Sequence, residues 1–182
     1  MTAPIFLVDG FEETEALVTA DILVRGGVDA PLVSLTGREL AEGSHRISVK
    51  TDLMFGDTAG KTDGWDMIVL PGGPGTEDYK EHTEFMAFVK EWCGSGKLTA
   101  AICAAPTVLG RLGLLDGRRA VCYPGLESGL AGAEIAEGDV VTDGNIITSK
   151  GPATVMAFGF ALVEALMGKE TADEVKKKFL YK

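Results

Sequence analysis

The chain has 182 residues, of which 46% are hydrophobic and 24% charged, a composition typical of a globular protein that buries a substantial core. We therefore expect one domain spanning residues 1–182. The formal net charge is −10, which argues against nucleic acid or an anionic membrane as the main partner, because both attract basic surfaces.

The three cysteines have no disulfide-framework spacing, which favours a reducing compartment. The first apolar run is too short for a signal peptide, and no stretch is long enough to span a membrane. With two histidines and no CxxC or HExxH pattern, we expect no metal site. These features predict a cytoplasmic protein without a membrane segment.

Short apolar segments alternate along the chain with amphipathic ones, a pattern that predicts a parallel sheet covered by helices on both faces. In chain order, the expected strands are Pro4–Val8, Ala30–Leu35, Arg46–Val49, Asp66–Leu70, Leu98–Ile102, Arg119–Cys122, Val140–Thr142 and Asn145–Thr148. The expected helices are Thr14–Arg25, Glu84–Trp92, Pro106–Leu112, Ala153–Met167 and Thr171–Phe179. Asp143-Gly144 is a strong hairpin signal, and the alternation at Arg46–Val49 indicates an exposed hairpin strand.

Cys103 lies where a strand pattern ends and a helical pattern begins. Ala101 and Ala105 flank it at two positions' distance, the pattern of a nucleophile elbow with cysteine in place of serine. N–H groups of the following helix favour negative charge, so we expect a lowered thiol pKa, a strained backbone, and an anionic intermediate bound by the N–H of Ala104. The alternative is a buried core cysteine.

A second expected strand, Asp66–Leu70, runs into the glycine-rich turn Pro71-Gly72-Gly73-Pro74-Gly75. Such a turn brings backbone N–H groups close to a ligand, although it lacks the Gly-Lys-Ser/Thr ending of a phosphate-binding loop. By itself, this turn is equally consistent with a tight connection between a strand and the next element. Beside the elbow it predicts an active-site rim, with Gly72 in the pocket and the N–H of Gly73 as a second oxyanion donor.

Four stretches, spread along the chain in order, carry a family resemblance: Gly10–Glu15, Ile68–Gly73, Ala101–Pro106 and Thr148–Pro152. With these motifs the chain resembles the ThiJ/PfpI superfamily of class I glutamine amidotransferase-like proteins, in particular its parkinsonism-associated deglycase branch. The resemblance covers almost the whole chain. It implies a flavodoxin-like α/β three-layer sandwich with a parallel central sheet and a nucleophile elbow.

The resemblance also implies a homodimer that packs through the first helix. Arg25 would then attract anionic ligands across the interface; its alternative is an exposed residue at a helix end. His45 is the other candidate for attracting anions, although we expect it on a surface hairpin rather than as a base.

Three acidic residues, Glu12, Glu13 and Glu15, follow the first expected strand. Acids are common at helix starts, so Glu12 and Glu13 are expected to be solvated. For Glu15, the resemblance implies a protonated carboxyl beside the Cys103 sulfur. Burial and like charge both disfavour ionisation, so we expect a raised pKa and a carboxyl able to move a proton during attack on a carbonyl.

No histidine follows Cys103 in the sequence. A Cys–His mechanism needs a base near the sulfur, so this argues against amidotransferase or cysteine-protease chemistry. Relatives often carry histidine just before the residue matching Pro124, where this chain has Tyr123. We expect both residues in the pocket, with Tyr123 either giving a hydrogen bond or forming an aromatic wall.

These features favour a cofactor-independent glyoxalase III or deglycase-like enzyme acting on α-oxoaldehydes such as methylglyoxal and glyoxal, or on their early adducts. The resemblance implies that Cys103 adds to the aldehyde, Glu15 moves a proton between adjacent carbons, and water releases a hydroxy acid. The alternative is an oxidative-stress sensor or redox-regulated chaperone that uses Cys103. A third hypothesis is a PfpI-type peptidase or amidase, which is disfavoured because no histidine follows Cys103.

Overall fold

The computed structural model describes residues 1–58 and 62–181. At its centre is a seven-stranded sheet in the order β10-β11-β7-β6-β1-β2-β5. These strands are β1 (Ile5–Leu7), β2 (Leu32–Ser34), β5 (Leu53–Met54), β6 (Met67–Leu70), β7 (Leu98–Ile102), β10 (Val140–Asp143) and β11 (Ile146–Ser149). All neighbours in this sheet pair in parallel except β10 and β11, which form the predicted hairpin at Asp143-Gly144.

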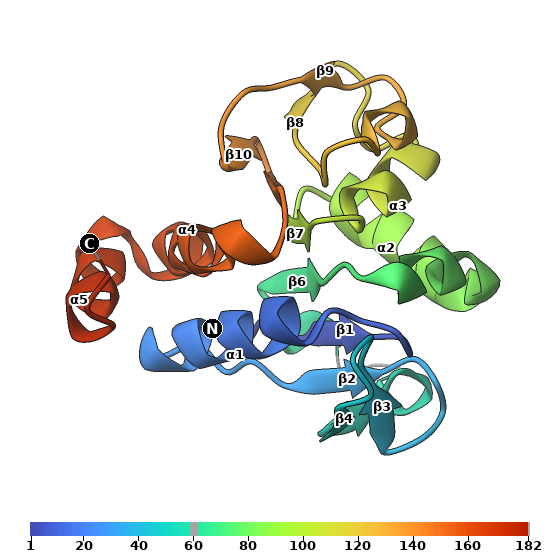
Figure 1. The fold of residues 1–182 in the computed structure, drawn as a ribbon, viewed down its shortest axis with the longest axis horizontal. Helices are drawn as coiled ribbons and strands as arrows, with labels where there is room; N and C mark the ends of the chain where they lie inside the picture. Colours follow the sequence, from blue (N-terminus) through green and yellow to red (C-terminus); the bar gives the residue numbers. More distant parts are fainter. Residues whose placement is uncertain (59–61, 182) are drawn as a thin grey trace.

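Helices cover both faces of this sheet, as Figure 1 shows. On one side lie α1 (Glu13–Arg25), α4 (Val155–Met167) and α5 (Lys169–Lys178), and on the other α2 (Thr83–Gly94) and α3 (Pro106–Arg111). Short 3-10 helices connect them: η1 (Phe55–Asp57), η2 (Thr62–Gly64), η3 (Pro74–Glu81), η4 (Glu127–Gly129) and η5 (Pro152–Thr154). The three-layer α/β architecture predicted from the sequence is confirmed.

The side chains of β1 show how the sheet divides the core. Alternate residues of a strand point to opposite faces, so Ile5 and Leu7 belong to the buried cluster under α1 and α4, and Phe6 to the cluster under α2 and α3. All three side chains are fully buried. None of the helices formed by the described residues is long and apolar enough to cross a bilayer.

Two small sheets lie outside the main one. β3 (Leu40–Glu42) and β4 (Ser48–Lys50) pair antiparallel, which confirms the hairpin strand expected at Arg46–Val49. β8 (Arg119–Ala120) pairs with β9 (Glu134–Ile135), so the strand expected at Arg119–Cys122 is shorter than predicted.

The physical reason for this shortening lies in the hydrogen bonds that follow β8. The N–H of Val121 donates to Thr148 Oγ1 at 3.1 Å, and the N–H of Tyr123 donates to the carbonyl of Cys103 at 2.7 Å. These bonds replace a strand ladder, and they tie the segment after β8 to the elbow.

The turn after β6 continues into η3, which the sequence did not predict. Its only fully buried large side chain is Tyr79, whose hydroxyl donates to the carbonyl of Phe6 at 2.8 Å. Because η3 lacks the repeated apolar spacing of an amphipathic helix, periodicity could not reveal it.

Candidate active site

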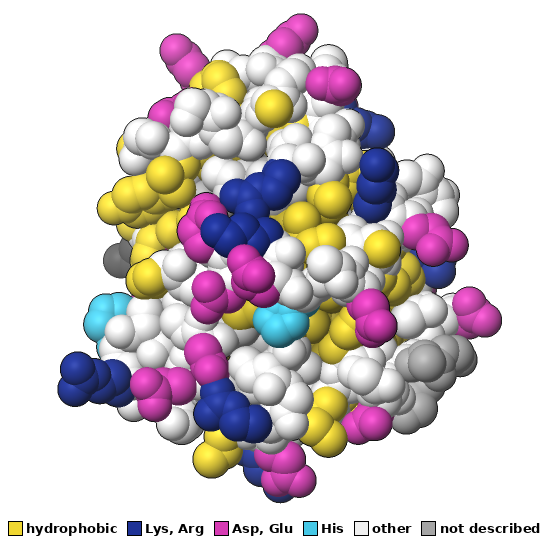
Figure 2. Space-filling view, turned by 90° about the vertical axis from the view of Figure 1, so that its right-hand side faces the viewer, with side chains coloured by type: hydrophobic (Ala, Val, Ile, Leu, Met, Phe, Trp, Pro, Cys, Tyr) yellow, Lys and Arg dark blue, Asp and Glu magenta, His cyan; other side chains and the backbone are white. Residues whose placement is uncertain are grey.

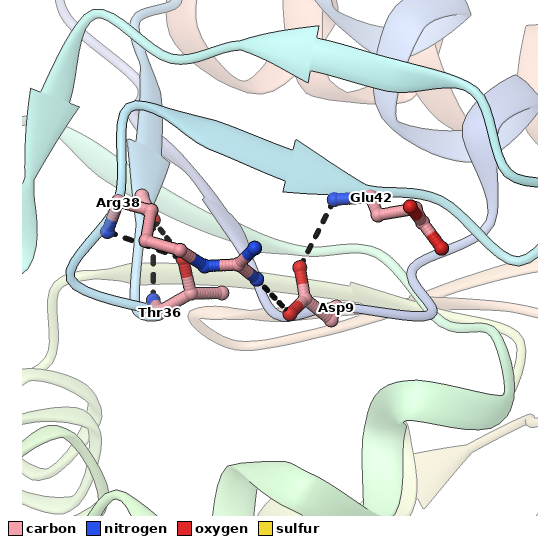
Figure 3. A network of polar contacts seen from close by, with 5 residues as sticks. Asp9, Thr36, Arg38 and Glu42 are labelled. Atoms are coloured by element: carbon pink, nitrogen blue, oxygen red, sulfur yellow. Dashed lines mark hydrogen bonds and ion pairs between the residues drawn. The ribbon is translucent and has the colours of Figure 1, made fainter.

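The loop between β1 and α1 is held from two sides. Asp9 pairs with Arg38 and accepts a hydrogen bond from the N–H of Glu42 at 3.0 Å (Figure 3). The N–H of Gly10 donates to the carbonyl of Glu42 at 2.7 Å, and the carbonyl of Gly10 accepts from the N–H of Gly75 at 3.0 Å. The loop is therefore fixed between the β3–β4 hairpin and the glycine-rich turn, which sets the position of the first turn of α1.

Glu12 caps the start of α1. Its carboxylate accepts a hydrogen bond from the N–H of Glu15 at 2.7 Å, and its own N–H donates to the carbonyl of Gly72 at 2.9 Å. A side-chain acceptor at this position satisfies one of the free N–H groups of a helix start. Glu12 therefore links the helix to the glycine-rich turn. Its side chain is partly exposed to solvent.

Glu13 is only 6% exposed, so the expectation that it is solvated is wrong. The β3–β4 hairpin folds over the helix start. The Glu13 carboxylate accepts hydrogen bonds from Ser44 Oγ at 3.0 Å and from the N–H of His45 at 2.6 Å, and it pairs with His45 Nδ1 at 2.8 Å. Burial acts to raise the pKa of Glu13, but these hydrogen bonds outweigh it and hold the pKa at about 2.

Glu15 is 1% exposed and lies at the centre of the site. Its Oε2 accepts a hydrogen bond from the N–H of Gly72 at 2.8 Å. Its Oε1 is buried, with no partner of ordinary hydrogen-bond geometry in the described part of the chain, and the Cys103 thiol is near enough to affect the pKa of the carboxyl. Burial raises the Glu15 pKa to about 7, because the Gly72 N–H and the thiol only partly offset the loss of water.

Cys103 has the backbone conformation that the elbow pattern predicts. Its φ is 65°, a left-handed value that is uncommon for a residue with a side chain. Two hydrogen bonds hold this conformation, since the N–H donates to the carbonyl of Ser149 at 2.9 Å and the carbonyl accepts from the N–H of Tyr123 at 2.7 Å. The sulfur is thereby fixed at the C-terminal end of β7, before α3 begins at Pro106.

Gly72 and Gly73 allow the glycine-rich turn to approach the elbow. A Cβ at Gly72 would lie 2.6 Å from Cys103 Cβ and 2.8 Å from the nitrogen of Ala104, distances that side chains do not tolerate. Gly73 has a φ of 105°, a value that favours glycine. The N–H groups of Gly73 and Ala104 interact with the Cys103 thiol and stabilise its anionic form.

The pKa of Cys103 is nevertheless raised, to about 12, and not lowered as the sequence suggested. Burial is the largest cause, followed by the charge and hydrogen bond of Glu15, and together they outweigh the N–H groups of Gly73 and Ala104. The sequence argument included the N–H groups and omitted the neighbouring carboxylate. Since Glu15 and Cys103 repel each other when both are ionised, the thiolate forms when the proton resides on Glu15.

Tyr123 lies near the sulfur, with Gly151 next to both. A Cβ at Gly151 would be 3.3 Å from Tyr123 Cδ2 and 3.9 Å from Cys103 Sγ. Tyr123 is 49% exposed, so its ring borders the site as a partly solvated wall. The following Pro124 is exposed. Gly151 was not predicted as a site residue, although it lies in one of the four family-like stretches.

Of the two candidates for attracting anions, Arg25 lies away from the sulfur within one chain, and His45 is an exposed residue of the segment between β3 and β4. Arg25 is ten residues after Glu15 on α1, roughly 15 Å along the helix, and it pairs with Asp21 at 2.8 Å. His45 is held by Glu13. Glu12, Glu13 and His45 place metal-capable atoms within 4.8 Å of one another, but the Glu13 oxygens are already hydrogen-bonded.

A cavity of about 510 Å³ opens beside the elbow. It is lined by Gly73, Pro74, Thr76, Glu77, Ala104, Thr107, Arg111, Leu126, Ser128, Gly129 and Ala131. Sequence reasoning identified only two of these residues, Gly73 and Ala104. The others come from η3, α3 and the segment around η4, which no motif connected to the cysteine.

Comparison with known proteins identifies the family. The DJ-1/PfpI family matches residues 1–165. The chain belongs to this family. Protein dj-1beta of Drosophila melanogaster is 35% identical over 98% of this chain and 96% of its own length. The crystal structure of Drosophila melanogaster DJ-1beta matches the fold with a TM-score of 0.91, covering 98% of this chain and 97% of that one.

Two further relatives differ in length and in what their names state. Protein DJ-1 homolog B of Arabidopsis thaliana is 41% identical over 91% of this chain, which spans only 38% of the relative. The glutathione-independent glyoxalase DJR-1.2 of Caenorhabditis elegans is 34% identical over 91% of this chain and 88% of its own length. The DJ-1/PfpI family therefore includes a glyoxalase that works without glutathione.

Replacing Glu15 with glutamine removes the negative charge that raises the Cys103 pKa. We expect iodoacetamide to label Cys103 at pH 8 about tenfold faster in Glu15→Gln than in the wild type, because at that pH only about a tenth of the Glu15 carboxyls carry the proton that allows the thiolate to form. Peptide mass spectrometry at successive times gives the rate for each cysteine. Glu164→Gln, on the exposed side of α4, is the control and leaves the rate unchanged.

Cys93 and Cys122 are internal references in the same experiment. All three thiols are buried, and Glu15 is not among the causes that raise the pKa of Cys122 to about 11. We therefore expect Cys93 and Cys122 to be labelled at the same rates in Glu15→Gln as in the wild type. An unchanged Cys103 rate in Glu15→Gln, or an equal increase at all three thiols, would contradict the assigned electrostatics.

The Glu15 pKa also predicts how stability depends on pH. The carboxyl has a pKa of about 7 in the folded chain and a model value of 4.5, so between these values the folded state binds more protons than the unfolded state. The stability contribution of Glu15 is therefore complete below pH 4.5 and is lost as the pH rises through 7. Relative to Glu15→Gln, wild type should lose about 3 kcal/mol of unfolding free energy over this range. Urea denaturation of both proteins measures the difference, and a constant difference would refute the raised pKa.

Proposed function

We propose that this protein is a cofactor-independent glyoxalase or deglycase-like enzyme that acts on α-oxoaldehydes or their early adducts. The observation that carries the proposal is the buried Glu15 carboxyl, with its pKa near 7, beside Cys103. The kinship with a glutathione-independent glyoxalase supports the same chemistry. The catalytic roles of both residues are part of the proposal.

The proposed reaction begins when Cys103 Sγ forms a bond to the aldehyde carbon of methylglyoxal. The aldehyde C=O becomes an alkoxide, which takes the proton that the Cys103–Glu15 pair held, giving a hemithioacetal. The N–H groups of Gly73 and Ala104 stabilise the oxyanion while it exists. Donors fixed before the reaction are effective because they need no rearrangement as charge develops.

Glu15, now a carboxylate, removes the proton from the former aldehyde carbon, and the hydroxyl proton of that carbon passes to the oxygen of the adjacent carbon. Glu15 then returns its proton to the adjacent carbon. The hemithioacetal becomes a thioester of a 2-hydroxy acid. Water then cleaves the C–S bond, releasing lactate and restoring the thiol. The net reaction adds one water to methylglyoxal, and no outside oxidant or reductant is needed. A pKa near 7 suits a group that must both accept and donate a proton at neutral pH.

Turnover of methylglyoxal to lactate tests this function. We expect Cys103→Ser and Glu15→Gln to lose about a hundredfold or more of kcat/KM, the usual scale for general acid–base assistance. Cys93→Ser and Glu164→Gln are the matched controls and retain activity. Circular dichroism verifies that all four variants are folded.

Normal turnover in Glu15→Gln would show that the carboxyl moves no proton in the reaction. A wild type without activity on aldehydes, whose Cys103 oxidises readily with peroxide, would favour the redox sensor instead.

We also propose a homodimer that packs through α1. Leu17 and Val24 lie seven residues apart on one helix face and are 38% and 60% exposed, whereas Ile22 and Leu23 are fully buried beneath the helix. Light scattering at micromolar concentration should give twice the chain mass for wild type and the chain mass for the double variant Leu17→Glu and Val24→Glu. Ile135→Glu, at another exposed apolar position, is the control. A monomeric wild type would overturn the proposal.

A further inference from the structure

The cavity beside Cys103 is much larger than methylglyoxal requires. Its volume is about 510 Å³, whereas a three-carbon aldehyde has the bulk of a few water molecules, each about 30 Å³. Its lining includes Gly73 and Ala104, whose N–H groups interact with the Cys103 thiol, and Arg111 at the end of α3, whereas Cys103 itself is not among the lining residues. The site therefore has room for a substrate that extends well beyond its reactive carbonyl.

Arg111 lines the same cavity, eight residues after Cys103 in the sequence. Ala104, Thr107 and Arg111 follow one another at intervals of three and four residues, so they share one face at the elbow and along α3. From Pro106 to Arg111, α3 extends roughly 8 Å along its axis. Leu126 and Ala131 also line the cavity and add apolar surface suited to a hydrocarbon chain.

The Arg111 guanidinium is only loosely paired. Its Nη2 lies 3.5 Å and 3.4 Å from the two carboxylate oxygens of Glu77, longer than the roughly 2.7–2.9 Å of a strong charge-assisted hydrogen bond. Glu77 also pairs with Lys80 at 3.3 Å, so this carboxylate is shared between two cations. Arg111, Lys80 and Glu77 together keep one net positive charge. Besides Glu77, Arg111 has N–H donors free to bind the carboxylate of a ligand.

Figure 2 looks onto the side of the molecule that carries α2, α3 and η3. Lys and Arg side chains meet Asp and Glu side chains near the middle of this face, with apolar surface close by. An anionic ligand that reached Arg111 could displace Glu77, which would keep Lys80 as its partner.

We propose that the cavity is a two-ended substrate site, in which Arg111 binds a carboxylate while Cys103 attacks an α-oxoaldehyde group at the other end of the same molecule. The substrate class is an α-oxoaldehyde, or an early adduct of one, with an aliphatic chain that ends in a carboxylate. This inference rests on the proposed function, because it assigns the second end of the same site. Arg111 determines specificity and takes no part in the proton transfers.

Two substrates of equal length test the inference: 2-oxoheptanal, and its analogue with a carboxylate in place of the terminal methyl group. The quantity compared is the ratio of their kcat/KM values, carboxylate over methyl. We expect Arg111→Met to lower this ratio about tenfold, mainly through KM of the carboxylate substrate, because a hydrogen bond to a charged group is lost. Glu77→Gln should raise the ratio, since it removes the competing carboxylate. Arg119→Met, an exposed arginine outside the cavity lining, should leave it unchanged.

A second measurement does not depend on turnover. Heptanedioate should slow the alkylation of Cys103 in wild type and have little effect in Arg111→Met. If neither oxoaldehyde is converted by wild type but heptanedioate protects Cys103 through Arg111, the proposed reaction is wrong and the two-ended site is right. An unchanged substrate ratio in Arg111→Met, or equal protection in both proteins, overturns the inference.

Discussion

The burial of one carboxyl group against a backbone N–H and a thiol governs the architecture of this site. Glu15 accepts a hydrogen bond from Gly72 at 2.8 Å, and a Cβ at Gly72 would collide with Cys103. The start of α1, the turn after β6 and the elbow after β7 must therefore meet within van der Waals distance. Two sets of hydrogen bonds maintain this contact. One fixes the β1–α1 loop, and the other holds Cys103 at a positive φ.

The same contact sets the chemistry through electrostatics. Burial raises the pKa values of both Glu15 and Cys103, and the ionised carboxylate raises that of the thiol further. Only one of the two groups is readily ionised at a time, so the pair handles a single mobile proton. The N–H groups of Gly73 and Ala104 favour negative charge at the sulfur and at any oxyanion beside it. Histidine is therefore not needed as a base in the proposed reaction.

Local patterns were sufficient to predict the layers of the fold. The expected strand Leu98–Ile102 matches β7 residue for residue, and Asp143-Gly144 marks the hairpin between β10 and β11. These predictions succeeded because apolar periodicity and turn residues depend on near neighbours in the chain. The 3-10 helix Pro74–Glu81 escaped prediction, and the strand that begins at Arg119 was predicted two residues too long, because Tyr79 and Tyr123 find their backbone partners far away in sequence.

By itself, the sequence determined the elbow at Cys103, the glycine-rich turn, the family, and Glu15 as a candidate partner of the sulfur. The tertiary structure alone decided that Glu13 is buried under the hairpin, that the thiol pKa rises, and that Arg111 shares a cavity with the elbow. The elbow and the glycine-rich turn can be identified from sequence because each depends on the backbone conformation of residues that are adjacent in the chain. Burial, charge coupling and cavity shape depend on segments that meet only when the chain has folded, so no local pattern could show them.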